Sequence, residues 1–311
     1  MLDVLVILLR LAQYGGAVVL LGTPLFLLYG LRGSDAVALG WTRSLLVSAA
    51  AVVAIGSAAA FAAQTAVMAG SLTEGLKPAT LGFMLTGTSL GPAFLVRTLA
   101  ALLALLALIQ DKPSRGLWKF VAVAGLIVGA SFAWTGHGAA TEGAGRYVHL
   151  TAAILHSWAA AVWLGALAAL LILTFGRRSK TVDSDRILHR ALHGFAGVGS
   201  ASVAVLVLSG LVNSWFMVGP DRIAGLLSTP YGLLLTGKLV LFALMLVLAA
   251  ANRFYLTPHL GSALDDPEYL GPAISRLKRS LVMETLLALG LLALVSIMGT
   301  LAPVSAMEMA M

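Results

Sequence analysis

Eight long apolar segments follow one another along the 311-residue chain, and they decide what it can fold into. Each is longer than the roughly 17 residues with which an α-helix crosses about 30 Å of hydrocarbon. Backbone polar groups cannot be left unpaired in lipid, so segments of this kind become helices. We predict an all-α integral membrane protein, a bundle of eight transmembrane helices that forms a single membrane domain without a soluble domain. The predicted spans are residues 4–31, 41–69, 91–110, 117–134, 146–175, 192–218, 231–254 and 280–302.

The composition supports this class and narrows the chemistry. Only 11% of the residues are charged, against about a quarter in soluble domains. The chain has no cysteine, which excludes disulfides and thiolate sites, so any metal must be bound by histidine, methionine, carboxylate or backbone groups. No P-loop, G-x-S-x-G or H-E-x-x-H motif occurs, and we therefore expect a protein that is not an enzyme. The N-terminal segment lacks the features of a signal peptide and is expected to remain as a transmembrane helix.

The distribution of basic residues predicts the orientation. Most of the 20 Lys and Arg residues flank the connections after the first, third, fifth and seventh segments. Cytoplasmic loops of membrane proteins carry the excess of positive charge, so these connections are assigned to the cytoplasm. Both termini then lie on the periplasmic side of a cell inner membrane. The net charge of +7 follows from this loop bias and needs no nucleic-acid partner.

Three histidines gather at the periplasmic end of two neighbouring segments. His149 and His156 are seven residues apart in one segment, which places them on one helix face, and His137 follows the preceding segment. In the predicted orientation His137 and His149 lie at the outer surface, with His156 about 10 Å further in. Neutral imidazole binds copper, zinc, iron and nickel. The alternative is that each histidine only hydrogen-bonds a neighbouring helix, but three together favour a metal site.

Methionines accumulate on the same side. Soft thioethers select Cu(I) rather than Cu(II), and an alternating Met pattern suits a flexible arm. An uninformative C-terminus remains the alternative for the tail. With the histidines on the same side, copper is the metal we predict. The candidate thioether ligands are Met298, Met307, Met309 and Met311.

Polar residues further along the chain suggest a route for an ion. Asn213 and Glu284 lie within apolar segments, where polar groups are costly, and are candidates for an ion or proton path. Glu284 is also expected to pair with the basic residues at positions 276–279. His189 and His193 share a helix face at the cytoplasmic side, either as an exit site or as interfacial residues.

Two basic residues inside the apolar segments need a separate explanation. Arg97 and Lys238 lie towards the outer ends of the third and seventh segments. Each must find a polar partner inside the bundle or extend its long side chain to the membrane surface.

Several stretches resemble one known family, the copper resistance protein D (CopD/PcoD) proteins of the bacterial inner membrane. The most specific is an H-x6-W-x-G element formed by His156, Trp163 and Gly165, and the resemblance extends over nearly the whole chain. The stretches are TGHGAA (135–140), ILHSWAAAVWLGAL (154–167), LSGLVNSWF (208–216), YGLLLTGKLVLFALMLVLAAANRFYLTP (231–258) and RSLVMETLLALGLLALVSIMGTLAP (279–303).

The resemblance implies a function in copper homeostasis and resistance, with copper moving from the periplasm through the membrane to the cytoplasm. It also implies a separate periplasmic copper-binding partner of the CopC type. Because the family is grouped with cytochrome-b-like bundles, a haem-binding electron-transfer or metal-reductase protein is the alternative. A third reading is a membrane scaffold or copper sensor that binds the metal without transporting it.

Overall fold

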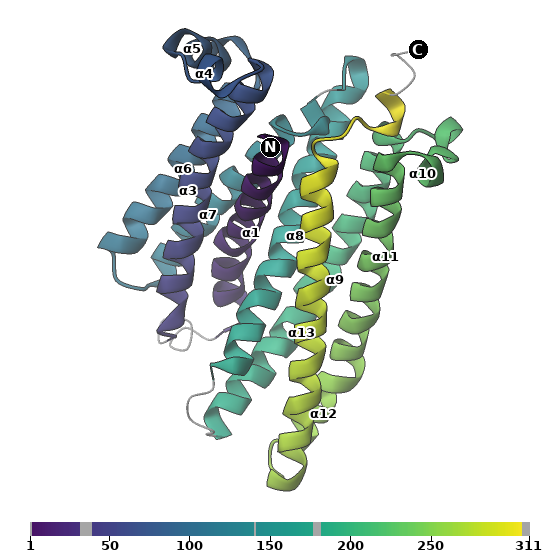
Figure 1. The fold of residues 1–311 in the computed structure, drawn as a ribbon. Coiled ribbons are helices and arrows are strands. Elements are labelled where there is room, and N and C mark those ends of the chain that lie inside the picture. Colours follow the sequence, from purple (N-terminus) through teal and green to yellow (C-terminus); the bar gives the residue numbers. More distant parts are fainter. Residues whose placement is uncertain (1, 32–38, 140, 177–181, 307–311) are drawn as a thin grey trace.

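The computed structural model describes residues 2–31, 39–139, 141–176 and 182–306, and Figure 1 shows their arrangement. The described residues form helices joined by turns and contain no strand. Eight helical spans are long and apolar enough to cross a membrane, which confirms the predicted helical membrane bundle. Their principal helices are α1 (Leu2–Tyr29), α3 (Trp41–Met68), α6 (Leu90–Gln110), α7 (Arg115–Ser131), α8 (Arg146–Phe175), α9 (Val182–Met217), α11 (Pro230–Ala251) and α13 (Pro267–Met298).

Short helices fill the connections. α4 (Leu72–Gly75) and α5 (Pro78–Gly87) join α3 to α6, and a π-helix, η5, followed by α12 extends α11. The remaining short elements are η1 (Phe132–Trp134), η2 (His137–Ala139), η3 (Gly143–Gly145), η4 (Pro220–Arg222), α10 (Gly225–Ser228), η5 (Asn252–Leu256) and α12 (Thr257–Ala263). The connection at 255–279, which hydropathy assigned to a loop, is therefore helical except at residues 264–266.

Two helices begin earlier than hydropathy predicted. The predicted starts were residues 192 and 280, whereas α9 begins at Val182 and α13 at Pro267. The added turns carry charges on one side but bury Leu188 and Leu277 on the other. An amphipathic turn lowers the mean hydropathy of a window without weakening the helix. Asp266 then fixes the start of α13, because its side chain accepts a hydrogen bond from the Glu268 amide (3.0 Å).

Helix α1 is the centre of the bundle. It packs against α3, α7 and α8 and also reaches α13. Its C-terminal half contains four fully buried side chains, Leu20, Leu21, Phe26 and Leu27. The start of α1 and the end of α13 lie at the same end of the bundle, together with α4 and α10 (Figure 1). We call this the terminal end, and the end that carries α12 the opposite end.

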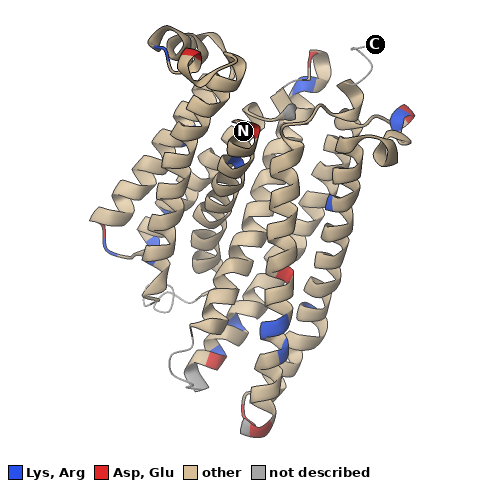
Figure 2. Ribbon diagram, in the orientation of Figure 1, with Lys and Arg blue, Asp and Glu red and all other residues tan. Residues whose placement is uncertain are grey.

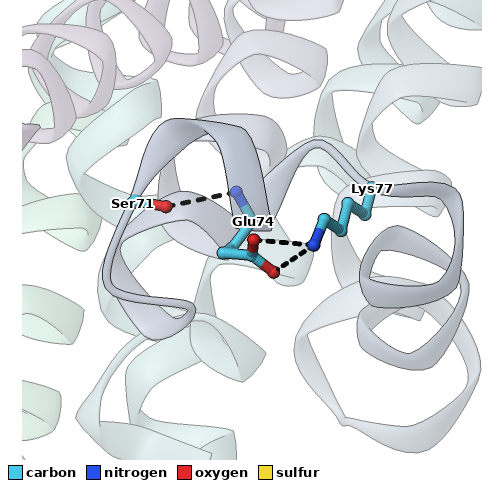
Figure 3. A network of polar contacts seen from close by, with 3 residues as sticks. All are labelled: Ser71, Glu74 and Lys77. Atoms are coloured by element: carbon cyan, nitrogen blue, oxygen red, sulfur yellow. Dashed lines mark hydrogen bonds and ion pairs between the residues drawn. The ribbon is translucent and has the colours of Figure 1, made fainter.

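Charged residues concentrate towards the two ends, and long stretches of the helices between them carry none (Figure 2). At the terminal end, the turn from α4 to α5 is held by a small polar network (Figure 3). Ser71 accepts a hydrogen bond from the Glu74 amide (3.2 Å), and Lys77 Nζ contacts both Glu74 carboxylate oxygens at 2.6 and 2.7 Å. Because this ion pair is exposed, it contributes little to stability.

The closest helix crossing joins α1 to α8 through two glycines. A Cβ atom on Gly22 would lie 1.9 Å from the carbonyl oxygen of Ala161 and 2.8 Å from the Cα of Gly165. Thr23 Oγ1 donates a hydrogen bond to the Gly165 carbonyl oxygen (3.2 Å) at the same crossing. Small residues let membrane helices approach to backbone contact, so this crossing fixes α8 against the central helix.

We predict that Gly22→Ala separates α1 from α8 and lowers the free energy of unfolding by about 1–3 kcal/mol, the usual cost of overpacking. Gly15→Ala on the same helix is the matched control, because no atom lies within 4 Å of its added methyl group. Thermal unfolding of the two purified variants in detergent measures the difference. Equal transition temperatures would show that the crossing is not as close as described.

Candidate functional site

The two histidines of α8 both face α9. The His149 ring is 2% exposed and stacks on Phe216, with centroids 4.8 Å apart and the planes 7° from parallel. Seven residues further along α8, His156 Nδ1 lies 3.0 Å from Ser209 Oγ, seven residues before Phe216 on α9. The two helices therefore run antiparallel and in register across this interval, and the imidazoles are about 10 Å apart along the axis.

The Ser209 hydroxyl fixes the tautomer of His156. Ser209 has a single hydroxyl proton and donates it to the carbonyl oxygen of Val205 (2.5 Å). Its oxygen must then accept the Nδ1–H of His156, so we assign the proton of the neutral ring to Nδ1. The Nε2 lone pair of His156 is thereby available for a metal ion or another donor.

His149 is held in a similar way from a different element. Its Nδ1 lies 2.6 Å from Thr141 Oγ1, in the connection that leads from η2 into α8. A hydroxyl on one ring nitrogen orients the imidazole, which is how histidines that bind metals are usually positioned. The sequence did not predict that the Nδ1 atom of each histidine would contact a hydroxyl group.

Asn213 lies between the levels of the two histidines. It is on α9 between Ser209 and Phe216, which are the partners of His156 and His149. Its Oδ1 is buried and has no hydrogen-bond partner among the described residues. An unmet acceptor of this kind costs about 1–3 kcal/mol and calls for an explanation such as a bound water or ion.

Trp163 lies seven residues beyond His156 on α8 and contacts a carboxylate of α13, that of Glu284. Trp163 Nε1 donates to Glu284 Oε1 (3.2 Å), and Asn252 Nδ2 donates to Glu284 Oε2 (2.8 Å). Glu284 is 3% exposed. The expected pairing with the basic residues at 276–279 is wrong, because the carboxylate turns inward to these two neutral donors. Asn252 opens the π-helix η5, a feature often found at functional positions.

A cavity of about 800 Å³ opens beside this carboxylate. It lies in the half of the bundle towards the opposite end, among α8, α9, η5 and α13. Trp163, Asn252 and Glu284 line it from one side, and His189 and His193 from α9. The structure thus brings His189, His193 and Glu284 around one space. Within the described parts of the chain, however, no three His, Asp or Glu side chains are close enough to form a preformed metal cage.

The remaining predicted ligands lie at or beyond the terminal end. Met298 is buried in an apolar cluster with Met217, the residue that follows the Phe216 ring stacked on His149. His137 begins η2, and its side chain is outside the described part of the structure. Met307, Met309 and Met311 also lie outside the described residues.

Arg97 finds its partners inside the bundle and does not extend to the membrane surface. It is 1% exposed and donates hydrogen bonds to Gln13 Oε1, to the Ser131 hydroxyl and carbonyl, and to Thr135 Oγ1. Sequence reasoning missed this network because its acceptors lie far apart in the chain, on α1 and at the end of α7 with the turn that follows it.

Two family models match the chain. The model for the N-terminal domain of copper resistance protein D-like proteins matches residues 1–148, and the model for copper resistance protein D matches residues 189–298. No solved structure matches the chain.

Three characterised relatives agree with the family models. Copper resistance protein D of Pseudomonas syringae pv. tomato is 38% identical over 306 residues, which cover 97% of each chain. Copper transport protein CutJ of Bacillus subtilis is 28% identical over 258 residues, which cover 80% of this chain and 46% of that protein. Inner membrane protein YebZ of Escherichia coli is 29% identical over 178 residues, 56% of this chain and 57% of that protein.

The chain is a multi-pass inner-membrane protein. Polar groups, among them the two histidines of α8 and the buried carboxylate of Glu284, are spaced along the interior of its bundle. The chain belongs to the copper resistance protein D family, so the resemblance noted in the sequence is confirmed.

We predict that the Trp163 hydrogen bond contributes more to stability than that of Trp158. Trp163→Phe removes a hydrogen bond to a carboxylate, and such a bond contributes about 1.5–3 kcal/mol to stability. Trp158→Phe removes a hydrogen bond to the Leu126 carbonyl oxygen, and a bond between neutral groups contributes about 0.5–1.5 kcal/mol. Thermal unfolding in detergent compares the two variants. Equal losses would contradict the stronger hydrogen bond from Trp163 to Glu284.

Proposed function

We propose that this chain binds copper in the inner membrane as part of copper homeostasis and resistance, and passes it from the periplasm inward between α8 and α9. The family assignment supports copper as the cargo, since relatives are named for copper resistance and copper transport. The observation that carries the proposed route is the register of α8 and α9, in which His149, Asn213 and His156 follow one another in order of depth.

In this proposal the terminal end faces the periplasm, as the distribution of basic residues favours. His137 and His149 form the outer site. Met298, Met307, Met309 and Met311 collect Cu(I), or receive it from a periplasmic CopC-type protein, because thioethers prefer the monovalent ion. Met298, one of these thioethers, lies in a buried cluster with Met217 at the end of the bundle where His149 lies.

Transfer inward proceeds by exchange between ligands. His149 and His156 are too far apart along the helix to bind one ion together, so they act as successive sites. The Asn213 carbonyl oxygen is a weak ligand between them and can receive the ion without trapping it. His156 presents Nε2, since Ser209 holds its other nitrogen.

The cavity around Glu284 supplies the inner half of the route. A buried carboxylate stabilises a cation in a low-dielectric environment. Trp163 and Asn252 keep the Glu284 side chain aimed towards the face of α8 that carries His156. His189 and His193, which line the same cavity, are the proposed exit. No chemical step is required of the protein, and we infer that it is not an enzyme.

We expect His149→Ala and His156→Ala each to weaken Cu(I) binding by at least about tenfold, on the scale seen when groups around a metal site are removed. Competition with a chromogenic Cu(I) chelator measures the affinity of each purified variant. His259→Ala is the matched control, because His259 is exposed on α12. Unchanged affinity and stoichiometry in both variants would refute the site.

Transport is tested separately from binding. Wild-type protein in liposomes should move Cu(I) across the bilayer, and Glu284→Gln, which keeps the side-chain shape, should slow the flux while leaving outer-site binding intact. Binding without flux in the wild type would instead identify a scaffold or sensor.

The orientation has a direct test because the chain contains no cysteine. Thr73→Cys, exposed on α4 at the terminal end, should react with a membrane-impermeant maleimide in intact spheroplasts. Asp265→Cys, exposed beside α12, should react only after the membrane is permeabilised. The reverse pattern would place the termini in the cytoplasm.

A further inference from the structure

Arg97 is a buried cation that has no anionic partner among the described residues. Four of the five N–H groups of its guanidinium find acceptors, and all four bonds go to neutral groups. Gln13 Oε1, one of the acceptors, is also bound by the neutral Ser57 hydroxyl (3.1 Å). Such a network satisfies the hydrogen bonds of Arg97 but leaves its charge uncompensated.

Aromatic rings reduce this cost without removing it. The Arg97 Cζ lies 3.8 Å from the centroid of the Phe132 ring and 5.0 Å from that of Phe94. A cation–π contact offsets only part of the cost of an unpaired charge within the membrane.

A second arginine makes the local charge balance more positive. Arg10 of α1 lines the same small cavity as Arg97. Its Nη1 lies against Gly299, where the C-terminal end of α13 provides partial negative charge. In the described part of the chain, no carboxylate is within ion-pair distance of either guanidinium.

The cavity between the two arginines has the size and polarity for one small ion. Its volume is about 70 Å³, and Gln13, Gln64 and Thr135 line it together with the two arginines. A space of this size is large enough for a small ion such as a halide.

The start of α6 lies at the same cavity. Leu90, the first residue of α6, lines it; Ser89 makes no side-chain capping bond, and Thr88 Oγ1 accepts a hydrogen bond from the Gly91 amide (3.4 Å). The first amide groups of a helix carry partial positive charge and attract anions. Arg97, Arg10, the first residue of α6 and a set of neutral hydrogen-bonding groups therefore line one small space.

We infer that the cavity between Arg97 and Arg10 binds one small monovalent anion of the chloride type. The anion neutralises the buried charge and ties α1 to α6 and to the segment after α7. This site lies on the α1, α3 and α6 side of the bundle, away from the α8–α9 interface, and it does not depend on the proposed route for copper.

Chloride binding is tested on the purified full-length protein in detergent. Samples in sodium chloride and in sodium gluconate at equal ionic strength are compared by thermal unfolding, and chloride binding is followed by ³⁵Cl NMR line width. For the wild type we expect chloride to raise the transition temperature by about 2–4 °C and to broaden the ³⁵Cl line. Bromide should reverse the broadening by competing for the site. Equal transition temperatures together with no excess line width would overturn the inference.

Variants connect the effect to the cavity. Arg97→Gln should abolish both the chloride-dependent stabilisation and the excess line width, and Arg97→Lys should keep part of each. Arg115→Gln is the control, because Arg115 is an exposed arginine that binds the Leu28 carbonyl oxygen far from this cavity, and it should respond as the wild type does. An unchanged chloride response in Arg97→Gln would refute the assignment. If Arg97→Gln does not fold, Arg10→Gln decides the question, because it must weaken chloride affinity by at least about tenfold.

Discussion

Lipid offers no hydrogen bonds, and this constraint governs every polar group inside the bundle. Arg97, His149 and Glu284 are each almost fully buried, and each is held by side chains from other helices or connections. The partners are mainly hydroxyl, amide and indole groups. The interior is therefore organised by neutral donors and acceptors around a few charged or titratable residues.

Helix α8 links the two polar regions of the proposed route. Its contact with α1 at Gly22 and Gly165 fixes its position at backbone distance. The same helix then presents His149 and His156 to α9 and Trp163 to α13. A shift of α8 along α1 would move all three side chains relative to their partners, so the glycine crossing and the polar route depend on each other.

The fold class and the main spans were predictable because they depend on local properties. A run of apolar residues long enough to cross the bilayer identifies a helix without knowledge of its neighbours. The predicted starts of α9 and α13 were wrong for the same reason. The first turns of these helices are amphipathic and are stabilised by buried contacts of Leu188 and Leu277. Hydropathy averages over a window and cannot detect packing on one side of a helix.

The sequence alone determined the helical membrane class, the absence of thiolate ligands and the placing of His149 and His156 on one face of a helix. Those properties follow from composition and from helical periodicity. Only the tertiary structure decided that Ser209 and Phe216 contact these histidines, that Glu284 turns to Trp163 rather than to the nearby basic residues, and that Arg97 is buried beside Arg10. These outcomes depend on the register and rotation of helices distant in the chain, and both are set by packing between helix surfaces.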